Sequence, residues 1–203
     1  AASDVYKRQT EKYFFMDVAH IMGDGMTMNV LFEDINALYA GKAAVPSEYT
    51  YYEYILDEKK RDEEGGREEN IRYFTEQMKD LKIRRSILTK KEHRGLDFGI
   101  NAALRNRFEK INRKKLTAFC HENGVSENVV FLTAYNYCIS LFSNEKDTVS
   151  TSIHSGRTDS RWNRLAGPLF RTYYFRYTEN KEETVAEMLK RSGRQIMETM
   201  RCY

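Results

Sequence analysis

The pattern of hydrophobic and polar positions along this chain is typical of strands in some segments and of helices in others. An almost continuous apolar run at residues 13–19, rich in aromatic side chains, predicts a strand that is buried on both faces. The run leads into a turn marked by Asp24 and Gly25. Apolar residues then recur every three or four positions over residues 28–39, which predicts a helix with one buried face that Gly41 ends.

The next segment carries many charges. The pattern predicts a tyrosine-rich helix over residues 46–56, opened by its proline, and a second helix over residues 67–81. The mixed charge run at residues 57–70 is interpreted as a solvated connection between the two helices. Residues 82–94 are basic and irregular and are interpreted as a linker, and a strand is expected at residues 96–104.

Clear helical patterns return after residue 112. An amphipathic helix is expected over residues 113–123, with Gly124 as its end signal. Ser126 then caps a helix over residues 127–142. Because that helix is apolar nearly all round, it is expected to be deeply buried.

Two strands and a helix follow. Residues 147–153 alternate like a half-buried strand, and a second strand is expected at residues 170–177. The last helix is expected to start near Thr184, because Glu187 three residues later completes a capping box. Strands and helices therefore alternate, which predicts a mixed α/β chain rather than a bundle or a sandwich of sheets.

Composition and charge exclude several classes of function. The 33 basic and 30 acidic residues are interleaved, so no one-sided basic surface for a nucleic acid is expected. No apolar run approaches the length that spans a membrane. The three cysteines, at positions 120, 138 and 202, lack metal-site spacing and fit reduced thiols of a cytoplasmic protein.

Both ends of the sequence suggest a piece of a longer protein. Residues 1–9 show no helical or strand period and resemble a translated adapter stretch, so they are interpreted as a non-native leader. The last helical pattern stops at residue 203 without a cap or terminator.

The segment AHIMGDG at residues 19–25 is the strongest candidate for chemistry. It places His20 between a strand and a helix, where an imidazole can take or give a proton near neutral pH. Asp24 can hold the turn or the ring, and Gly25 is expected to permit the tight backbone into the helix. Taken alone, a structural histidine beside an Asp-Gly turn fits this pattern as well.

This segment resembles the HHxxxDG motif of condensation domains of nonribosomal peptide synthetases. Three further blocks follow in family order: YYEYIL at residues 51–56, SGRT at residues 155–158, and the stretch from Ala166 to Arg176. The resemblance implies the chloramphenicol-acetyltransferase-like fold, an α+β two-layer sandwich with two lobes. It divides this chain into residues 10–82, the end of a first lobe; residues 83–94, a linker; and residues 95–203, the start of a second lobe.

The resemblance also implies a reaction. Such domains join two substrates that carrier domains present on phosphopantetheine arms, and they form an amide bond in a tunnel between the lobes. His20 corresponds to the catalytic histidine, which takes the proton of the attacking amine or orients the amine and stabilises the intermediate. Carrier domains and an adjacent adenylation domain are the partners implied, and no cofactor bound by this chain, no metal, no nucleic acid and no membrane is expected.

Two charged residues are expected to support the site. Asp24 is interpreted as a structural carboxylate that needs a cationic partner when it is buried. Arg157, brought near by the strand that ends at Ile153, is the candidate partner. Gly25 is expected to let the helix start close to the tunnel, where backbone N–H groups can face the thioester carbonyl.

Other residues are assigned to the tunnel or the carrier arm from the resemblance. They are Ala19, Thr27, His154, Gly156 and Arg171. His154 has a plainer alternative as a histidine at a strand end, and the basic linker is either a surface for an acidic carrier domain or a solvated loop. Ala19 replaces the first histidine of the motif, and Arg171 stands where the family has asparagine, so the acceptor side departs from the family pattern.

Two classes of function therefore stay open. The first is a piece of a condensation domain, inactive as an isolated fragment, or of a related epimerisation or ester-forming acyltransferase domain. The second is a degenerate, non-catalytic module that docks carrier domains.

Overall fold

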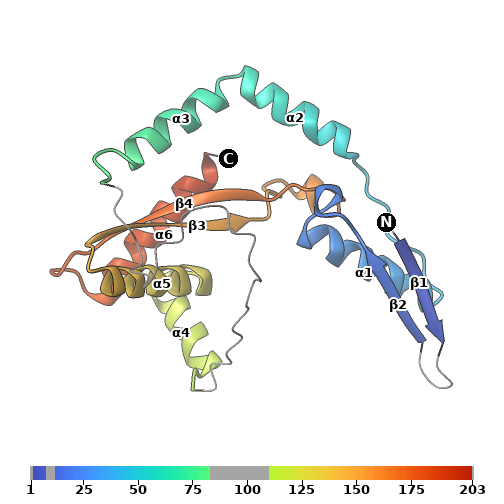
Figure 1. Cartoon of the computed structure of the whole chain (residues 1–203), viewed down its shortest axis with the longest axis horizontal. Helices are drawn as coiled ribbons and strands as arrows, with labels where there is room; N and C mark the ends of the chain where they lie inside the picture. The colour runs from blue at the N-terminus through green and yellow to red at the C-terminus, as the bar shows by residue number, and fades with distance from the viewer. Residues whose placement is uncertain (1, 8–11, 83–109, 203) are drawn as a thin grey trace, which may run out of the picture. The chain divides into compact units, whose positions relative to one another are not determined.

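The computed structural model describes residues 2–7, 12–82 and 110–202. These residues form two compact units, one of residues 2–72 with 153–173 and the other of residues 73–152 with 174–202. Figure 1 labels the elements from β1 to α6 along the chain. The described residues contain both helices and two two-stranded sheets, so the mixed α/β prediction is confirmed.

The first unit begins with a β-hairpin. Strand β1 (Ala2–Lys7) pairs antiparallel with β2 (Lys12–Asp17), in a register that runs from Ala2 opposite Asp17 to Lys7 opposite Lys12. Residues 2–7, whose sequence shows no strand period, thus form β1, and the interpretation of residues 1–9 as a non-native leader stays a prediction. An antiparallel neighbour satisfies the main-chain groups of a strand whether or not its side chains alternate.

Strand β2 confirms the predicted strand but not its predicted burial on both faces. Tyr13, Phe14 and Phe15 are exposed by 53%, 47% and 64%. The sheet that contains them has two strands among the described residues. Its side chains are buried only where another element packs against one of its faces.

A short 3-10 turn, η1 (His20–Met22), follows β2 and leads into α1 (Gly25–Tyr39). Gly41 lies two residues beyond α1 with φ of 72°, as a helix-ending glycine does. The helix prediction is confirmed, whereas its apolar face is only partly covered, because Leu38 and Tyr39 are exposed.

Helix α2 (Tyr51–Glu63) starts and ends later than the sequence pattern predicted, and α3 (Gly66–Gln77) ends before the predicted residue 81. Thr50 caps α2 in a capping box with Glu53, so the helix starts five residues after Pro46. Most of the charge run at residues 57–70 is helical, because it forms the end of α2 and the start of α3. Ion pairs between residues four positions apart, such as Lys59 with Glu63, support the helix.

The core of the first unit lies between α2 and the loop that leads to β4. It consists of Tyr54, Trp162, Leu165 and Leu169, with Tyr49 packed against them. The 3-10 turn η2 (Ser160–Trp162) places Trp162 edge-on to Tyr54, at a ring distance of 5.5 Å. This aromatic packing fixes the loop from which several site residues project.

The second unit contains α4 (Arg113–Asn123), α5 (Glu127–Ser143), β3 (Asp147–His154), β4 (Arg171–Thr178) and α6 (Val185–Arg201), although both strands extend into the first unit. Three predicted helix signals are confirmed. Gly124 ends α4 in a left-handed conformation, Ser126 caps α5, and Thr184 caps α6 in a capping box with Glu187.

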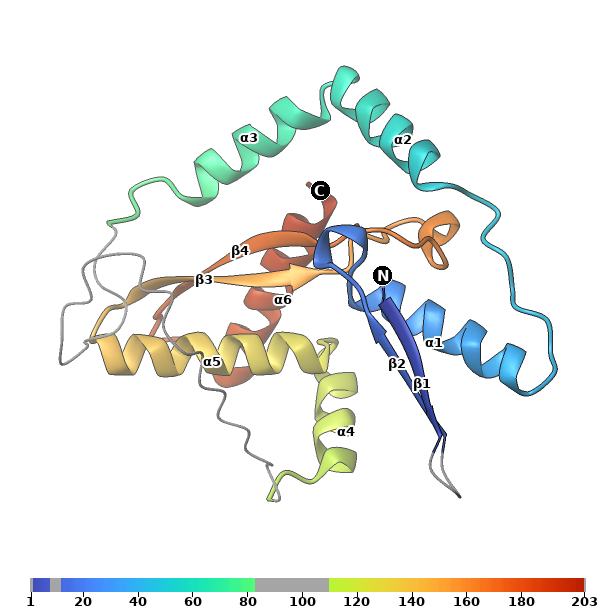
Figure 2. The ribbon, with the colours of Figure 1, turned by 45° about the vertical axis from the view of Figure 1, so that its right-hand side comes forward.

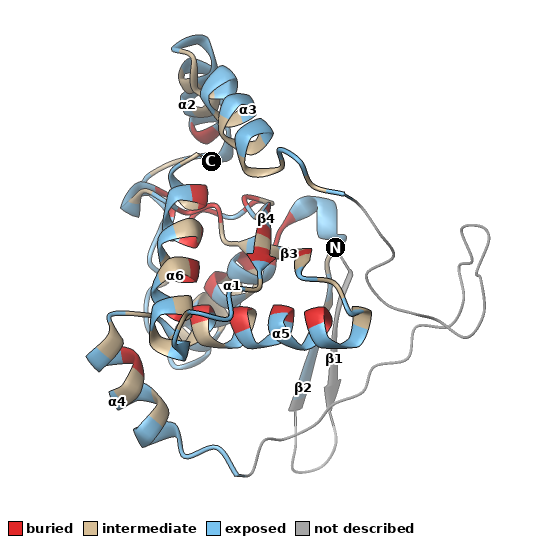
Figure 3. Ribbon diagram, turned by 90° about the vertical axis from the view of Figure 1, so that its left-hand side faces the viewer, coloured by how far each residue is buried: buried red, intermediate tan, exposed pale blue. Residues whose placement is uncertain are grey.

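Helices α5 and α6 lie against one face of strands β3 and β4 (Figure 2). Asn136 of α5 donates a hydrogen bond to Ser150 of β3, and Tyr177 of β4 donates one to Met188 of α6. The buried residues of α5 follow one side of the helix (Figure 3), while Phe131, Leu141 and Phe142 are exposed. The expectation of a deeply buried α5 was thus wrong for its outer side.

Two sequence predictions, the linker at residues 83–94 and the strand at residues 96–104, lie outside the described residues. Within the described ranges, no helix combines the length and the apolar composition that crossing a membrane requires.

Candidate functional site

His20 lies on the turn η1, directly after strand β2 and directly before α1. The amide of Met22 donates to the carbonyl of Ala19 at 2.8 Å, which fixes the backbone on both sides of the histidine. The side chain is exposed, and its ring meets the ring of Phe170 edge-on, with centroids 5.5 Å apart and planes at 73°. His20 is therefore held on a rigid turn and is accessible for proton transfer.

Asp24 is the N-cap of α1. Its Oδ1 accepts a hydrogen bond from the amide of Thr27 at 2.9 Å, and its own amide donates to the Thr27 hydroxyl at 3.3 Å. This capping box satisfies two amides that would otherwise lack partners at the start of a helix. The N-cap of α1 is therefore held at a fixed point four residues after His20.

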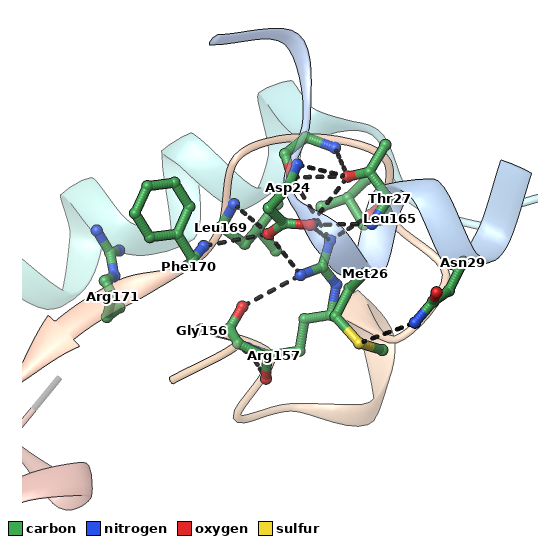
Figure 4. Close-up of polar contacts among 12 residues, drawn as sticks. Asp24, Met26, Thr27, Asn29, Gly156, Arg157, Leu165, Leu169, Phe170 and Arg171 are labelled. Carbon is green, nitrogen blue, oxygen red and sulfur yellow. Dashed lines mark hydrogen bonds and ion pairs between the residues drawn. The ribbon is translucent and has the colours of Figure 1, made fainter. Parts of the chain in front are cut away.

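Arg157 contacts the same carboxylate from the loop after β3, as Figure 4 shows. Its two terminal nitrogens lie 2.8 Å and 3.1 Å from the two oxygens of Asp24. It also donates to the carbonyls of Ser155 and Leu165, at 3.1 Å and 2.9 Å. The predicted contact between Asp24 and Arg157 is present, and both side chains are almost fully buried.

Two further donors reach Asp24 from the segment before β4. The amides of Leu169 and Phe170 donate to Oδ2 at 3.0 Å and 3.2 Å (Figure 4). Burial raises the pKa of the Asp24 carboxyl, but the hydrogen bonds from Arg157 and Thr27 and the guanidinium charge outweigh burial and lower that pKa from 3.8 to about 2. Asp24 is therefore an ionised, structural carboxylate at neutral pH.

Thr27 belongs to this buried cluster and does not face an open surface. Its hydroxyl lies 3.1 Å from Asp24 Oδ1, 2.9 Å from the carbonyl of Gly167 and 3.0 Å from the Gly167 amide. The expectation that Thr27 lines the substrate tunnel is corrected accordingly. Its side chain joins α1 to the loop before β4.

Gly156 also has a structural position. Its φ is 71°, and a Cβ at this residue would lie 1.7 Å from the carbonyl oxygen of Leu169. Glycine is thus required here for both conformation and space. The expected tunnel role of Gly156 is replaced by close packing that lets Arg157 reach Asp24.

The tight turn into α1 depends on Gly23 rather than on Gly25. A Cβ on Gly23 would lie 2.7 Å from Cγ2 of Thr27, whereas a Cβ on Gly25 would meet nothing within 4 Å. The role expected for Gly25 in the backbone turn was therefore wrong. The first residue of a helix accepts a side chain, while the crowded residue before the N-cap does not.

His154 ends strand β3 and is half-buried. Its Nδ1 accepts a hydrogen bond from the amide of Gly156 at 3.1 Å, which leaves the proton of the neutral ring on Nε2. Burial lowers the pKa of this imidazole. His154 therefore supports the Gly156 turn, and its contact with a substrate remains a prediction.

Arg171 opens β4 and is paired within the first unit. One guanidinium nitrogen donates to the hydroxyl of Tyr54 at 2.7 Å and contacts the carboxylate of Glu58. The side chain is thus held against α2. The guanidinium, which was expected at the tunnel, is paired with the carboxylate of Glu58 on that helix. Ala19, in contrast, is exposed beside His20, and its assignment to the tunnel stays a prediction.

In the described part of the chain, no group of three or more His, Cys, Asp or Glu side chains is arranged to hold a metal ion. The site instead combines an accessible imidazole with a buried ion pair. Such an arrangement suits proton transfer or hydrogen bonding at His20, on a backbone that the buried pair keeps in place.

Sequence reasoning missed two residues of this site. Phe170 was assigned to a strand and to the family block from Ala166 to Arg176 but to no role in the site, and its contact with His20 joins positions 150 residues apart in sequence without a local signal. Gly23 was overlooked because the family motif directs attention to Gly25. Gly23 lies in extended backbone before the N-cap, so helical spacing does not predict its closeness to Thr27.

Comparison with known proteins gave consistent matches. A family model described as "Condensation domain" matches residues 2–202. Among curated proteins, bacitracin synthase 1 of Bacillus licheniformis is 25% identical over 197 residues, which cover 93% of this chain and 4% of that protein. Surfactin synthase subunit 1 of Bacillus subtilis (strain 168) is 22% identical over 206 residues, which cover 96% of this chain and 6% of that protein.

Solved structures of condensation-type domains also match this chain. The first condensation domain of the CDA synthetase superposes with a TM-score of 0.72 at 15% identity, over 99% of this chain and 46% of that chain. The X-domain from teicoplanin biosynthesis gives a TM-score of 0.68 at 14% identity, over 99% and 47%. This chain thus spans less than half of these solved domains and a few per cent of the curated relatives.

Proposed function

Because this chain belongs to the condensation-domain family, whose model matches residues 2–202, we propose that it is part of a condensation domain of nonribosomal peptide synthesis. Its fold is that of condensation domains, the chloramphenicol-acetyltransferase-like fold that the sequence resemblance implied. The proposed reaction joins an aminoacyl or peptidyl thioester to an amine through an amide bond. The observation that carries the proposal is the exposed His20 on a turn that the buried ion pair of Asp24 and Arg157 anchors.

The proposed step needs one proton transfer. The acceptor amine attacks the carbonyl carbon of the donor thioester, the tetrahedral intermediate collapses, the C–S bond breaks and the thiol of the donor carrier arm leaves. His20 takes the proton of the attacking amine, or it orients that amine and stabilises the oxyanion. Presenting both substrates on tethered arms lowers the entropic cost of their encounter.

The arms and partners follow from this chemistry. The substrates arrive as thioesters on the phosphopantetheine arms of carrier domains, and an adenylation domain in the same protein supplies the activated amino acid. Curated relatives in the comparison carry the names of peptide synthetases. We infer that this chain is one part of such a protein, works in the cytoplasm and is inactive without the rest of its domain.

Substitution of His20 tests the proposal. In a completed condensation domain that carries this sequence, His20→Ala is expected to reduce amide formation by about 10²–10⁴-fold, as loss of a general base does. His121→Ala is the matched control, because His121 is an exposed imidazole on α4 in the other unit. Wild-type rates in the His20→Ala variant would contradict the proposal.

A non-catalytic docking module is the second candidate, and Ala19 in place of the first motif histidine favours it. This alternative predicts that carrier binding is unaffected by His20→Ala and that no amide product forms with either protein. An epimerase or an ester-forming acyltransferase shares the motif, and product analysis with amine and alcohol acceptors separates these reactions.

A further inference from the structure

We propose that Phe170 is a positioning residue for His20: its ring sets the orientation of the imidazole that faces the substrate. The proposal rests on the proposed function for its catalytic consequence and on the ring geometry for its structural part. Phe170 lies outside the block of residues that carries the histidine motif, and 150 positions separate it from His20 in sequence.

The backbone segments that carry His20 and Phe170 are both anchored to the carboxylate of Asp24. Asp24 begins α1 four residues after His20, and its Oδ2 accepts the amide of Phe170 at 3.2 Å. The amide of the preceding Leu169 donates to the same oxygen at 3.0 Å. Because Arg157 and Thr27 hold Asp24 in turn, the relative placement of the two rings is fixed by a buried cluster rather than by the exposed side chains.

The ring contact has the geometry that orients an imidazole. The centroids lie 5.5 Å apart with planes at 73°, an edge-on arrangement that aromatic pairs prefer over a face-to-face stack. Within the described ranges, no hydrogen bond to the protein engages either ring nitrogen of His20. The Phe170 ring therefore restrains the imidazole through its carbon skeleton and leaves both nitrogens available for an amine or an oxyanion.

The position of Phe170 is also partly open. Its side chain is 36% exposed, so its contact with His20 lies at the surface and not inside the core. Its neighbour Leu169, whose amide binds the same oxygen of Asp24, is fully buried. An exposed aromatic ring beside an exposed imidazole points to a role in the site.

Nuclear magnetic resonance of the 203-residue chain tests the contact directly. The chain has four histidines, so the ring protons of His20 are identified by their loss in His20→Ala. We expect a nuclear Overhauser effect between the rings of Phe170 and His20 in the wild-type chain. Phe170→Leu is expected to move the His20 ring resonances toward the values of a freely rotating histidine, and Phe170→Tyr is expected to preserve them.

Phe32→Leu is the matched control, because Phe32 is a similarly exposed phenylalanine of the same unit, at 48%. It should leave the His20 resonances unchanged. Absence of the wild-type Overhauser effect, or unchanged His20 resonances in a folded Phe170→Leu chain, would overturn the proposal. If Phe170→Leu does not fold, the wild-type effect and the Phe170→Tyr chain still decide the question.

Kinetics in a completed condensation domain test the catalytic consequence. Phe170→Leu is expected to lower kcat about 10- to 100-fold with little change in KM, because misplacing a catalytic group by a small distance costs rate rather than binding, and Phe170→Tyr is expected to restore it. If His20→Ala retains activity, the proposed function fails. If His20→Ala abolishes activity while Phe170→Leu keeps the wild-type kcat, the positioning proposal fails alone.

Discussion

Arg157 donates two hydrogen bonds to the carboxylate of Asp24, at 2.8 Å and 3.1 Å, across 133 positions of the chain. Their side chains are 2% and 5% exposed. The pair joins the start of α1 to the loop after β3, and the same carboxylate holds the segment that leads into β4. The turn that carries His20 is therefore fixed by contacts that lie far away in sequence.

The first prediction concerns the loss of the cation. Arg157→Ala is expected to lower the free energy of unfolding by about 3–5 kcal/mol, because it leaves the Asp24 carboxylate buried without its charge partner. Lys59→Ala is the control, since Lys59 pairs with Glu63 at the surface of α2 and its loss should change stability little. Urea denaturation measures both variants, and equal losses would contradict the structural role of the buried pair.

The second prediction concerns acid. The pKa of Asp24 is lowered from 3.8 to about 2 in the folded chain, so ionised Asp24 stabilises the fold above pH 4. This contribution of about 2 kcal/mol should disappear as the pH falls from 4 to 2, because the unfolded chain then binds the proton more readily than the folded one. Carboxyl carbon resonances measured against pH check the folded value, and a midpoint near 4 would show that the pair does not hold the charge.

Local signals explain which parts of the fold could be predicted from the sequence. The ends of α4, α5 and α6 depend on Gly124, Ser126 and the pair of Thr184 with Glu187, each of which acts within four residues. Such contacts are encoded by spacing alone, so the predicted bounds agree with the structure to within one or two residues.

Long-range contacts explain the rest. The exposure of Phe14 and Phe15 depends on what packs against the two faces of the hairpin, which the apolar run itself does not encode. The contact of Asp24 with Arg157 was predictable because a buried carboxylate requires a cation and a family block supplied one. The contact of His20 with Phe170 was not, because an aromatic residue in a strand pattern fits ordinary packing equally well.

The third prediction compares two glycines that share a left-handed backbone. Gly156 and Gly41 have φ of 71° and 72°, but an added Cβ would meet a neighbour within 4 Å only at Gly156, where the carbonyl oxygen of Leu169 would lie 1.7 Å away. Gly41→Ala should cost about 1–2 kcal/mol for its conformation alone. Gly156→Ala should cost about 1–3 kcal/mol more, because the added methyl forces the backbone apart.

Chemical denaturation of the two variants gives the difference directly. The Gly156→Ala chain should also show changed amide resonances for Leu169 and Phe170, since the collision lies beside their bonds to Asp24. Equal stability of the two variants would mean that the loop after β3 moves away from Leu169 at no cost.

The last prediction separates the two glycines that flank Asp24. Gly25→Ala is expected to leave stability unchanged or to raise it by up to about 1 kcal/mol, because alanine favours a helix and its Cβ meets nothing within 4 Å. Gly23→Ala is expected to destabilise the chain by about 1–3 kcal/mol, because its Cβ would lie 2.7 Å from Cγ2 of Thr27. Thr27 cannot turn aside without breaking its bonds to Asp24 and Gly167. Thermal unfolding shows which of the two variants is less stable. A less stable Gly25→Ala chain would show that Gly25, and not Gly23, sets the turn.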